Sequence, residues 1–375
     1  MDIQTFRSSA AAIVCFCLTL TGGRLNAGPT DFDGMETGTS ALLDTAYDQY
    51  NSLHFDQAEA EIRQAVALQP DLPAPGLYLE DELSCQIREL HLSKKRNRKV
   101  EARFNESVKS ALVSVNAWEL AHHDGRGQLY LGTSLGECGI VAMLEGNYLA
   151  AYGFGQKANA ALMLARSRDA ELLDVDMGLG EYLYYCGNFN GLLRAVMDLH
   201  GNVPAGIILM QTCAAGTGRG ALPARLELAW IMTEETRDYE RALPYVREVL
   251  SRYPENWTNV MLALDEARGL GIKRTEAREL IESVCVRWDS GWRPPAYASV
   301  NPGPQRLALA KAYILEKRFD DARRHLTALS KGAGKTATEA STMIAGLDVA
   351  PPEVAPPEVA PPEVAPPEVV PPDAR

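Results

Sequence analysis

The sequence predicts an all-α protein, an irregular solenoid of helical hairpins followed by a disordered proline-rich tail. Two observations predict this fold class. Apolar residues make up 46% of the 375 residues, yet the alternating pattern of β-strands is nearly absent. In addition, an aromatic residue, a small residue three positions later and a proline beyond the same helix recur along the chain.

The first 27 residues have the layout of a secretory signal peptide. Arg7 precedes an apolar run from Ala10 to Leu20, and small residues then lead to Ala27. The run is shorter than the ~20 apolar residues that a membrane-spanning helix needs. We expect cleavage after Ala27, a linker over residues 28–40, and a periplasmic or secreted mature chain that does not insert into a membrane. A retained anchor is the alternative.

The recurring frame has three clear copies. In each, an aromatic residue opens the second helix of a hairpin and a proline, which cannot continue a helix, lies past its end. A small side chain at the contact between two helices lets their axes approach to ~8–10 Å, so we expect Ala58, Ala242 and Gly180 at such contacts. The copies are Phe55, Ala58 and Pro70; Phe189, Leu192 and Pro204; and Tyr239, Ala242 and Pro254.

Weaker copies and one long amphipathic stretch fill the intervals. The stretch from Val100 to Trp118 carries an apolar stripe with a spacing of three and four residues, which predicts a helix with one buried face. Because the aromatic positions are unevenly spaced, we expect either extra helices between the hairpins or repeats that have drifted. The weaker copies lie at Tyr148 and Ala151 with Gly139, at Ala277, and at Phe319 and Ala322.

This layout resembles the tetratricopeptide repeat, a helix-turn-helix unit of about 34 residues. The block from Asp174 to Gly187, with the hairpin that ends at Asn256, is similar to exported bacterial proteins of this class, mostly without assigned activity. The resemblance implies an irregular right-handed α-α superhelix over residues 41–346 and no known chemistry.

The resemblance also implies a binding groove lined by the inner face of each first helix. The partner-binding residues that it implies are Tyr47, Tyr50, Met177, Glu181, Tyr184, Tyr185 and Glu234. Members that clamp a carboxylate terminus carry lysines and asparagines in this groove, whereas this chain has Leu43 and Tyr47, which disfavours that role.

Motifs for catalysis or for cofactors are weak. Residues 132–136 read G-x-S-x-G around Ser134, but a serine nucleophile in this motif needs a preceding strand, and Gly139 assigns the segment to a helix. His122 and His123, which are followed by Asp124, could suggest a metal site, but no third ligand is spaced with them. The five cysteines after the signal segment form no CxxC pair, which leaves one disulfide or buried thiols as alternatives. We expect no catalytic residue, cofactor or metal.

Charge disfavours nucleic acid as a partner, since the net charge is −12. Lys94 to Lys99 form a basic cluster that we expect to be a solvated loop, with an anion site as the alternative. Residues 347–375 hold PPEVA repeats, which favour an extended polyproline II segment. This tail is either a spacer or docking strip, or an extension with no role of its own.

The combined expectation is a non-catalytic protein-binding scaffold of the bacterial cell envelope that holds a protein or peptide on its concave face. The alternative is a periplasmic small-molecule-binding component, or an enzyme, with a pocket near Tyr184 and Tyr185. A deep closed cavity would favour this alternative over an open groove. The sequence carries no signal of an oligomeric state.

Overall fold

A computed structural model describes residues 35–188, 200–296, 298 and 300–348. These residues form fifteen α-helices and one π-helix, and none of them lies in a strand, which confirms the all-α prediction. The elements are α2 Thr37–Asn51, α3 Phe55–Leu68, α4 Ala74–Leu92, α5 Arg98–His122, α6 Gly125–Leu144, α7 Tyr148–Arg168, α8 Val175–Asn188, α10 Val203–Ala215, α11 Ala221–Trp230, η2 Ile231–Glu235, α12 Tyr239–Arg252, α13 Trp257–Leu270, α14 Thr275–Asp289, α15 Gly303–Leu315, α16 Phe319–Ser330 and α17 Lys335–Asp348.

The recurring frame marks the second helix of most hairpins. Helices α3, α7, α12 and α16 begin at Phe55, Tyr148, Tyr239 and Phe319, as the frame predicts. Four small residues of the frame are fully buried, because they lie where one helix of the hairpin touches the other. They are Ala58, Ala242, Ala277 and Ala322, each 0% exposed. Ala151, in the weaker copy that begins at Tyr148, is only partly buried.

The third copy of the frame is corrected in part. Phe189 and Leu192 lie outside the described residues, and Pro204 lies in the first turn of α10 rather than after a helix. Gly180 does lie at a close helix contact, but the neighbouring helix is α10. A Cβ at Gly180 would come within 2.7 Å of Met210 Cγ and 2.8 Å of the Gly206 carbonyl oxygen. The missing side chain therefore lets α8 and α10 cross in contact.

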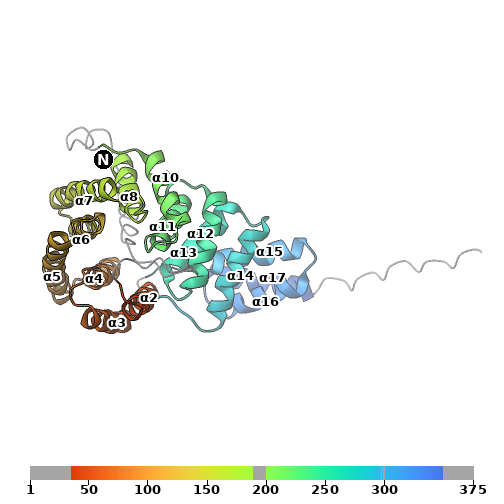
Figure 1. Ribbon diagram of the computed structural model, residues 1–375. Helices are drawn as coiled ribbons and strands as arrows, with labels where there is room; N and C mark the ends of the chain where they lie inside the picture. The colour runs from red at the N-terminus through yellow and green to blue at the C-terminus, as the bar shows by residue number, and fades with distance from the viewer. Residues whose placement is uncertain (1–34, 189–199, 297, 299, 349–375) are drawn as a thin grey trace, which may run out of the picture.

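Helices α2 to α11 curve into a ring, as Figure 1 shows. First helices α4 and α6 contact each other along the inside, whereas second helices α3, α5 and α7 lie outside them. The stripe on α5 faces inward as predicted, since Val100, Phe104 and Val115 are buried. The inner faces of α2, α4, α6, α8 and α11 thus point toward a shared interior.

Arg219 closes the ring. It lies in the loop between α10 and α11, yet its guanidinium donates to Asp44 Oδ1 at 2.7 Å and to Ser40 Oγ at 2.6 Å, both on α2. It also donates to the Tyr78 hydroxyl on α4. Gly220 N donates to Asp174 Oδ1 at 2.8 Å, which fixes the loop from the other side.

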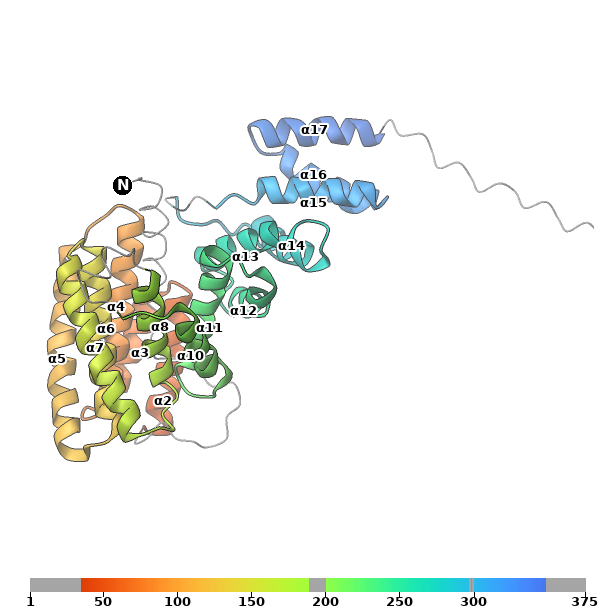
Figure 2. The same cartoon turned by 90° about the horizontal axis from the view of Figure 1, so that it is seen from above.

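A second set of contacts joins α2 to the start of the remaining chain. Asp48 accepts hydrogen bonds from Arg252 Nε at 3.1 Å and from the Tyr253 hydroxyl at 2.9 Å. The Asn51 carbonyl accepts from Asn256 Nδ2 at 2.8 Å. Helices α12 to α17, which we call the arm, extend from this junction away from the ring (Figure 2).

The segment boundaries differ slightly from those expected. Helix α2 begins at Thr37, inside the expected linker 28–40, and α17 ends at Asp348, just past the expected start of the tail. The proposed signal peptide and nearly all of the tail lie outside the described residues. Within the described ranges, no helix combines the length and apolar character needed to cross a membrane.

Candidate functional site

The structure turns the expected groove residues, apart from Glu234, toward the interior of the ring. Glu234 lies on η2 and interacts with Asp265 of α13. Closure of the ring by Arg219 explains this burial, because the concave face of an open solenoid becomes the inside of a closed one. Tyr47 is 0% exposed, Tyr50 1%, Met177 0%, Glu181 3% and Tyr184 1%, while Tyr185 and Glu234 are partly buried. The expectation of an open groove is therefore corrected to an enclosed interior.

Tyr184 and Tyr185 join α8 to the end of α11. The Tyr184 hydroxyl donates to Glu235 Oε2 at 2.5 Å, and the Tyr185 hydroxyl donates to Glu227. The two rings meet edge to face at 5.2 Å. Tyr184 is one of the expected partner-binding residues, but its side chain is buried between helices.

Five carboxyl groups gather on the inner faces of four helices. All are at most 3% exposed, although a buried ionised carboxylate needs a counter-charge or hydrogen bonds. They are Glu80 and Asp81 on α4, Glu137 on α6, Glu181 on α8 and Glu227 on α11. We call this set the acidic interior.

Burial and mutual repulsion raise the pKa values of the acidic interior. Burial raises the pKa of Glu80 to about 8, with a further contribution from Glu137. Burial raises the pKa of Glu227 to about 8 as well, although the hydroxyl of Tyr185 opposes this. Burial raises the pKa values of Asp81 and Glu181 well above their usual range, and the neighbouring carboxyl groups add to it. Neutral carboxyl groups are therefore favoured at pH 7.

Several polar atoms of this interior have no hydrogen-bond partner within the protein. Oε1 of Glu181 and Oε2 of Glu227 are in this state. The hydroxyl of the fully buried Tyr47 is in the same state, whereas Ser134 bonds to Glu80. A buried polar group without a partner costs roughly 1–3 kcal/mol, so the folded chain bears this cost at several places at once.

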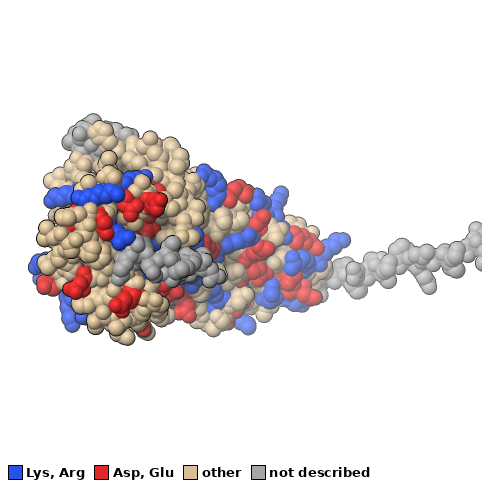
Figure 3. Space-filling model, viewed as in Figure 1, with Lys and Arg blue, Asp and Glu red and all other residues tan. Residues whose placement is uncertain are grey.

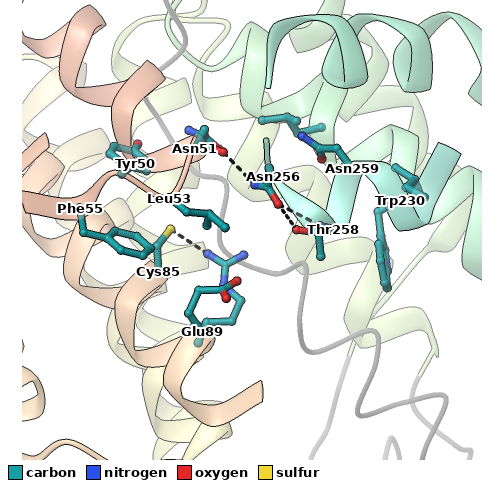
Figure 4. Close-up of a pocket in the computed structure, with 13 residues that line it drawn as sticks. Tyr50, Asn51, Leu53, Phe55, Cys85, Glu89, Trp230, Asn256, Thr258 and Asn259 are labelled. Atoms are coloured by element: carbon teal, nitrogen blue, oxygen red, sulfur yellow. Dashed lines mark hydrogen bonds between the residues drawn. The ribbon is translucent and has the colours of Figure 1, made fainter. Parts of the chain in front are cut away.

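A cavity of about 70 Å³ lies at the junction where the ring closes. Its walls come from the α2–α3 turn, α4, α11 and the first turn of α13. Figure 4 shows Tyr50 and Phe55 on one side and Trp230 on the other. The Trp230 side chain is only 5% exposed, and its Nε1 has no hydrogen-bond partner.

The cavity and the acidic interior share a wall. Tyr50 lines the cavity, and its hydroxyl donates to Asp81 Oδ2 at 2.5 Å. Cys85 also lines the cavity, and its Sγ lies 3.8 Å from Asp81 Oδ1. Arg88 reaches Cys85 Sγ at 2.9 Å, and its charge lowers the pKa values of Asp81 and Glu227. Asp81 therefore lies directly behind the cavity.

A π-helix follows Trp230 immediately. Such single-turn widenings of an α-helix are frequently found at functional sites. Here η2 carries Glu235, the hydrogen-bond partner of Tyr184, and Thr233, whose hydroxyl donates to Glu266 Oε2 at 2.9 Å. The π-helix thus links the α8 side of the ring to α13.

The residues of the weak catalytic and metal-binding motifs lie in helices and at a helix junction. Ser134 lies within α6, with helix on both sides, so the strand-turn-helix context of a nucleophile is missing. His122 ends α5 and Asp124 caps α6, at an exposed helix junction. In the described part of the chain no three His, Cys, Asp or Glu side chains are placed to hold a metal ion, and no disulfide joins the five cysteines.

Sequence reasoning missed Glu80, Asp81, Glu137 and Trp230. A signal for the first two was present, since Glu80, Asp81 and Glu82 form an acidic run in the middle of α4, next to the apolar residues Leu77, Tyr78 and Leu79. The basic residues from Lys94 to Lys99 are exposed; Lys94, Lys95 and Arg96 lie in the α4–α5 connection, and Arg98 and Lys99 lie in the first turn of α5.

Comparison with known proteins gives a similarity among solved structures. No protein-family model matches the chain, and no curated protein matches it. Among solved structures, the chain is similar to a tetratricopeptide repeat protein from Parabacteroides merdae ATCC 43184. The identity is 16%, the alignment covers 82% of this chain and 99% of the other, and the TM-score is 0.27.

Proposed function

We propose that this chain is a non-catalytic binding protein of the bacterial cell envelope whose ring holds a small polar molecule. The observation that carries the proposal is the cavity beside Asp81 and Trp230, behind which buried polar atoms lack partners. A ligand with complementary groups would supply those partners. A small-molecule-binding protein was the alternative function expected from the sequence, with its pocket near Tyr184 and Tyr185. We now propose the cavity lined by Tyr50 and Trp230 as that pocket.

An extended peptide on the concave face fits less well. Such a peptide needs a continuous groove, whereas Tyr47, Met177 and Glu181 are buried within the closed ring. The cavity of about 70 Å³ takes a molecule of only a few heavy atoms.

A thermal-shift screen with small cationic, anionic and neutral metabolites tests this function. A ligand that binds the folded state raises the melting temperature by mass action. The shift should shrink in Trp230→Phe, which keeps an aromatic wall but removes the Nε1 donor. It should persist in the matched variant Trp292→Phe, since Trp292 lies outside the cavity. A screen in which no compound shifts the melting temperature would contradict the proposal.

The envelope location rests on the first 27 residues of the sequence. Amino-terminal sequencing of the protein from fractionated cells should give Gly28 in the soluble envelope fraction. Met1 on a cytoplasmic protein would rule the location out.

A protein partner is the second candidate, and it would bind the outside of the ring. Large apolar side chains are exposed on the outer helices: Val113 is 70% and Leu120 75% exposed on α5, and Leu149 is 80% and Met163 59% exposed on α7. A photo-crosslinker placed at Leu149 should join the partner in envelope extracts, whereas one at Leu315 on the arm should not. Equal labelling at both positions would remove this candidate.

A further inference from the structure

We propose that the acidic proline-rich tail of this chain folds back and docks on the exposed cations where α4 connects to α5. We call these cations, Lys94, Lys95, Arg98 and Lys99, the basic junction. The inference goes beyond the proposed function and does not depend on the cavity. It joins two features of the sequence that the proposed function leaves without a role.

The basic junction consists of cations without partners. All four side chains are exposed, and within the described part of the chain none of them forms an ion pair or a side-chain hydrogen bond. Other arginines of the ring do form ion pairs, as Arg168 does with Glu119. Four unpaired positive charges from six consecutive residues therefore face the solvent together.

Arg96, in the middle of this segment, takes the neighbouring carboxylates. Its Nε lies 2.6 Å from Glu101 Oε1, and its Nη2 lies 3.3 Å from Glu145 Oε1. These two acidic side chains are thus paired with Arg96 and not with the basic junction. The positive charge of the four other cations remains uncompensated.

Helix α5 itself gives no reason for cations at this place. Arg98 and Lys99 lie in its first turn, where the helix dipole favours negative charge and disfavours positive charge. Asn97 caps the helix by accepting from Lys99 N at 3.0 Å, so capping does not need the basic side chains. A bound anion would reduce the mutual repulsion of the four cations.

The tail carries carboxylates that have no basic partner of their own. An acidic residue recurs every five positions, and no lysine, arginine or histidine lies between Pro351 and Ala374. Two prolines precede each acidic residue and favour polyproline II, in which residues five apart are separated by roughly 15 Å. The acidic residues are Glu353, Glu358, Glu363, Glu368 and Asp373.

The tail is long enough to reach the basic junction. It continues from α17 at the end of the arm, whereas α4 and α5 belong to the ring (Figure 2). Residues 351–375 span roughly 80 Å as polyproline II, and a compact chain of about 300 residues has a radius of gyration of roughly 20 Å. The tail can therefore turn back along the arm to the ring.

The tether makes such a contact effective. Exposed ion pairs are individually weak because solvent screens them. A flexible link within one chain, however, raises the local concentration of the tail to about the millimolar range. Since the repeats are nearly identical, any of them can occupy the basic junction. A docked tail would exclude weaker anions from these cations.

Carbodiimide cross-linking of the full mature chain tests the inference, because the reagent joins a lysine amine to a carboxyl group in contact with it. Peptide mass spectrometry should find the tail joined to the lysines of the basic junction at least about fivefold more often than to Lys157. Lys157 is the matched control, since it is exposed on α7 and also lacks a partner among the described residues. The preference should disappear in about 0.5 M sodium chloride, which screens the charges.

Arg98→Gln makes the test specific to charge. Arginine does not react with the carbodiimide, so this change keeps every lysine that can be linked, and it removes a cation that the helix dipole disfavours. The yield at the neighbouring lysines should fall at least about twofold. Lys273→Gln removes an exposed cation of the arm that has no ion pair among the described residues, and it should leave the yield unchanged.

Dilution separates the tail of the same chain from the tail of a second copy. The yield should stay constant over about a hundredfold dilution, because a tethered contact does not depend on concentration. A yield that falls with dilution would assign the contact to a second copy and overturn the proposal. Equal linking to Lys157 and to the basic junction, or a preference that resists salt, would also overturn it. None of these outcomes bears on the proposed function, which rests on the cavity.

Discussion

The ring and the arm are built from the same helical hairpins, yet they treat acidic residues in opposite ways. In the ring, the carboxyl groups of Glu80, Asp81, Glu137, Glu181 and Glu227 are buried on the inner faces of the helices. In the arm, most described carboxylates lie on the surface, and Glu266 is the buried exception. The repeat frame therefore determines the path of the backbone but not which side chains are buried between the helices.

Arginine pairs join each hairpin of the arm to the next. Arg247 pairs with Glu279, Arg274 with Glu240, and Arg278 with Glu316. Figure 3 shows the result, since blue and red side chains gather over the arm whereas much of the ring surface in that view is tan. Exposed pairs of this kind contribute little to stability because solvent screens them, so the arm gains solubility more than stability from them.

This difference indicates that the high content of acidic residues in the chain does not by itself account for the acidic interior. A chain that only needed solubility could place its carboxylates as the arm does. Burying five of them lowers stability at neutral pH, because each must stay protonated or remain without a full set of partners. The interior is better explained by a ligand that uses these groups.

The largest effect is expected from opening the ring. Arg219→Gln leaves Asp44 without its charged partner and Tyr78 without its donor, and it should cost about 3–5 kcal/mol of unfolding free energy. Chemical denaturation measures this loss. Arg274→Gln in the arm is the control and should leave the midpoint unchanged, since its pairs are exposed. Equal effects of the two changes would mean that Arg219 does not hold the ring closed.

A smaller loss is expected from Gly180→Ala at the crossing of α8 and α10. The new methyl group would meet the backbone oxygen of Gly206 at 2.8 Å, which no side-chain rotation can relieve, so the cost should be about 3 kcal/mol. Gly153→Ala on α7 is the matched control, because a Cβ there meets nothing within 4 Å. The control should stabilise the protein by up to about 1 kcal/mol through helix propensity. A neutral Gly180→Ala would show that the two helices are farther apart.

The shared repeat frame can be tested at the same position in both regions. Ala58→Leu in the ring and Ala242→Leu in the arm should each cost about 1–3 kcal/mol, because both alanines are fully buried at a helix contact. Leucine is nearly as good a helix former as alanine, so the loss reports packing. Thermal melts of the two variants should shift alike. If Ala242→Leu melts like the unaltered protein, the frame does not apply to α12.

The pH dependence of stability should separate the two regions. The pKa of Glu80 is raised to about 8 in the folded chain, so its stabilising contribution is complete below its unfolded pKa and is lost as pH rises toward 8. Over that window, each such group lowers the unfolding free energy by about 1.4 kcal/mol per pH unit. Glu80→Gln should therefore make the stability fall less steeply between about pH 5 and pH 8.

Glu276→Gln in the arm is the control for this slope. Arg274 lowers the pKa of Glu276, so the contribution of this carboxylate is already present above its unfolded pKa and stays constant as pH rises further. Urea titrations at several pH values measure both variants. If the slope of Glu80→Gln matches that of the unaltered protein, Glu80 is ionised in the folded state.

The sequence predicted the hairpins well because their signals are local. An aromatic residue such as Phe55 at a helix start, and a small residue such as Ala58 one turn later, report packing within one hairpin. The frame accordingly located α3, α7, α12 and α16. The sequence predicted a close helix contact at Gly180 but did not identify α10 as the helix in contact. A glycine indicates that another helix approaches closely, but it does not indicate which helix.

Closure of the ring and the site inside it could not be read from the sequence. Arg219 and Asp44 lie 175 residues apart in the sequence, and a single arginine in a glycine-rich loop carries no sign of that contact. Tyr47, Tyr50 and Glu181 were placed correctly on inner helix faces, but their burial follows from closure. Their role in binding a partner stays a prediction. The weak local signal of the acidic interior was the run from Glu80 to Glu82, whose meaning depends on the side chains opposite.

Infrared titration of the carboxyl groups tests the central claim most directly, because a protonated carboxyl group has a C=O band that an ionised one lacks. The full mature chain should keep protonated carboxyl groups at pH 7 that ionise near pH 8, and Glu80→Gln with Glu227→Gln should remove part of that band. If every carboxyl group of the folded chain ionises below about pH 5, where exposed Asp and Glu titrate, the acidic interior is not as described.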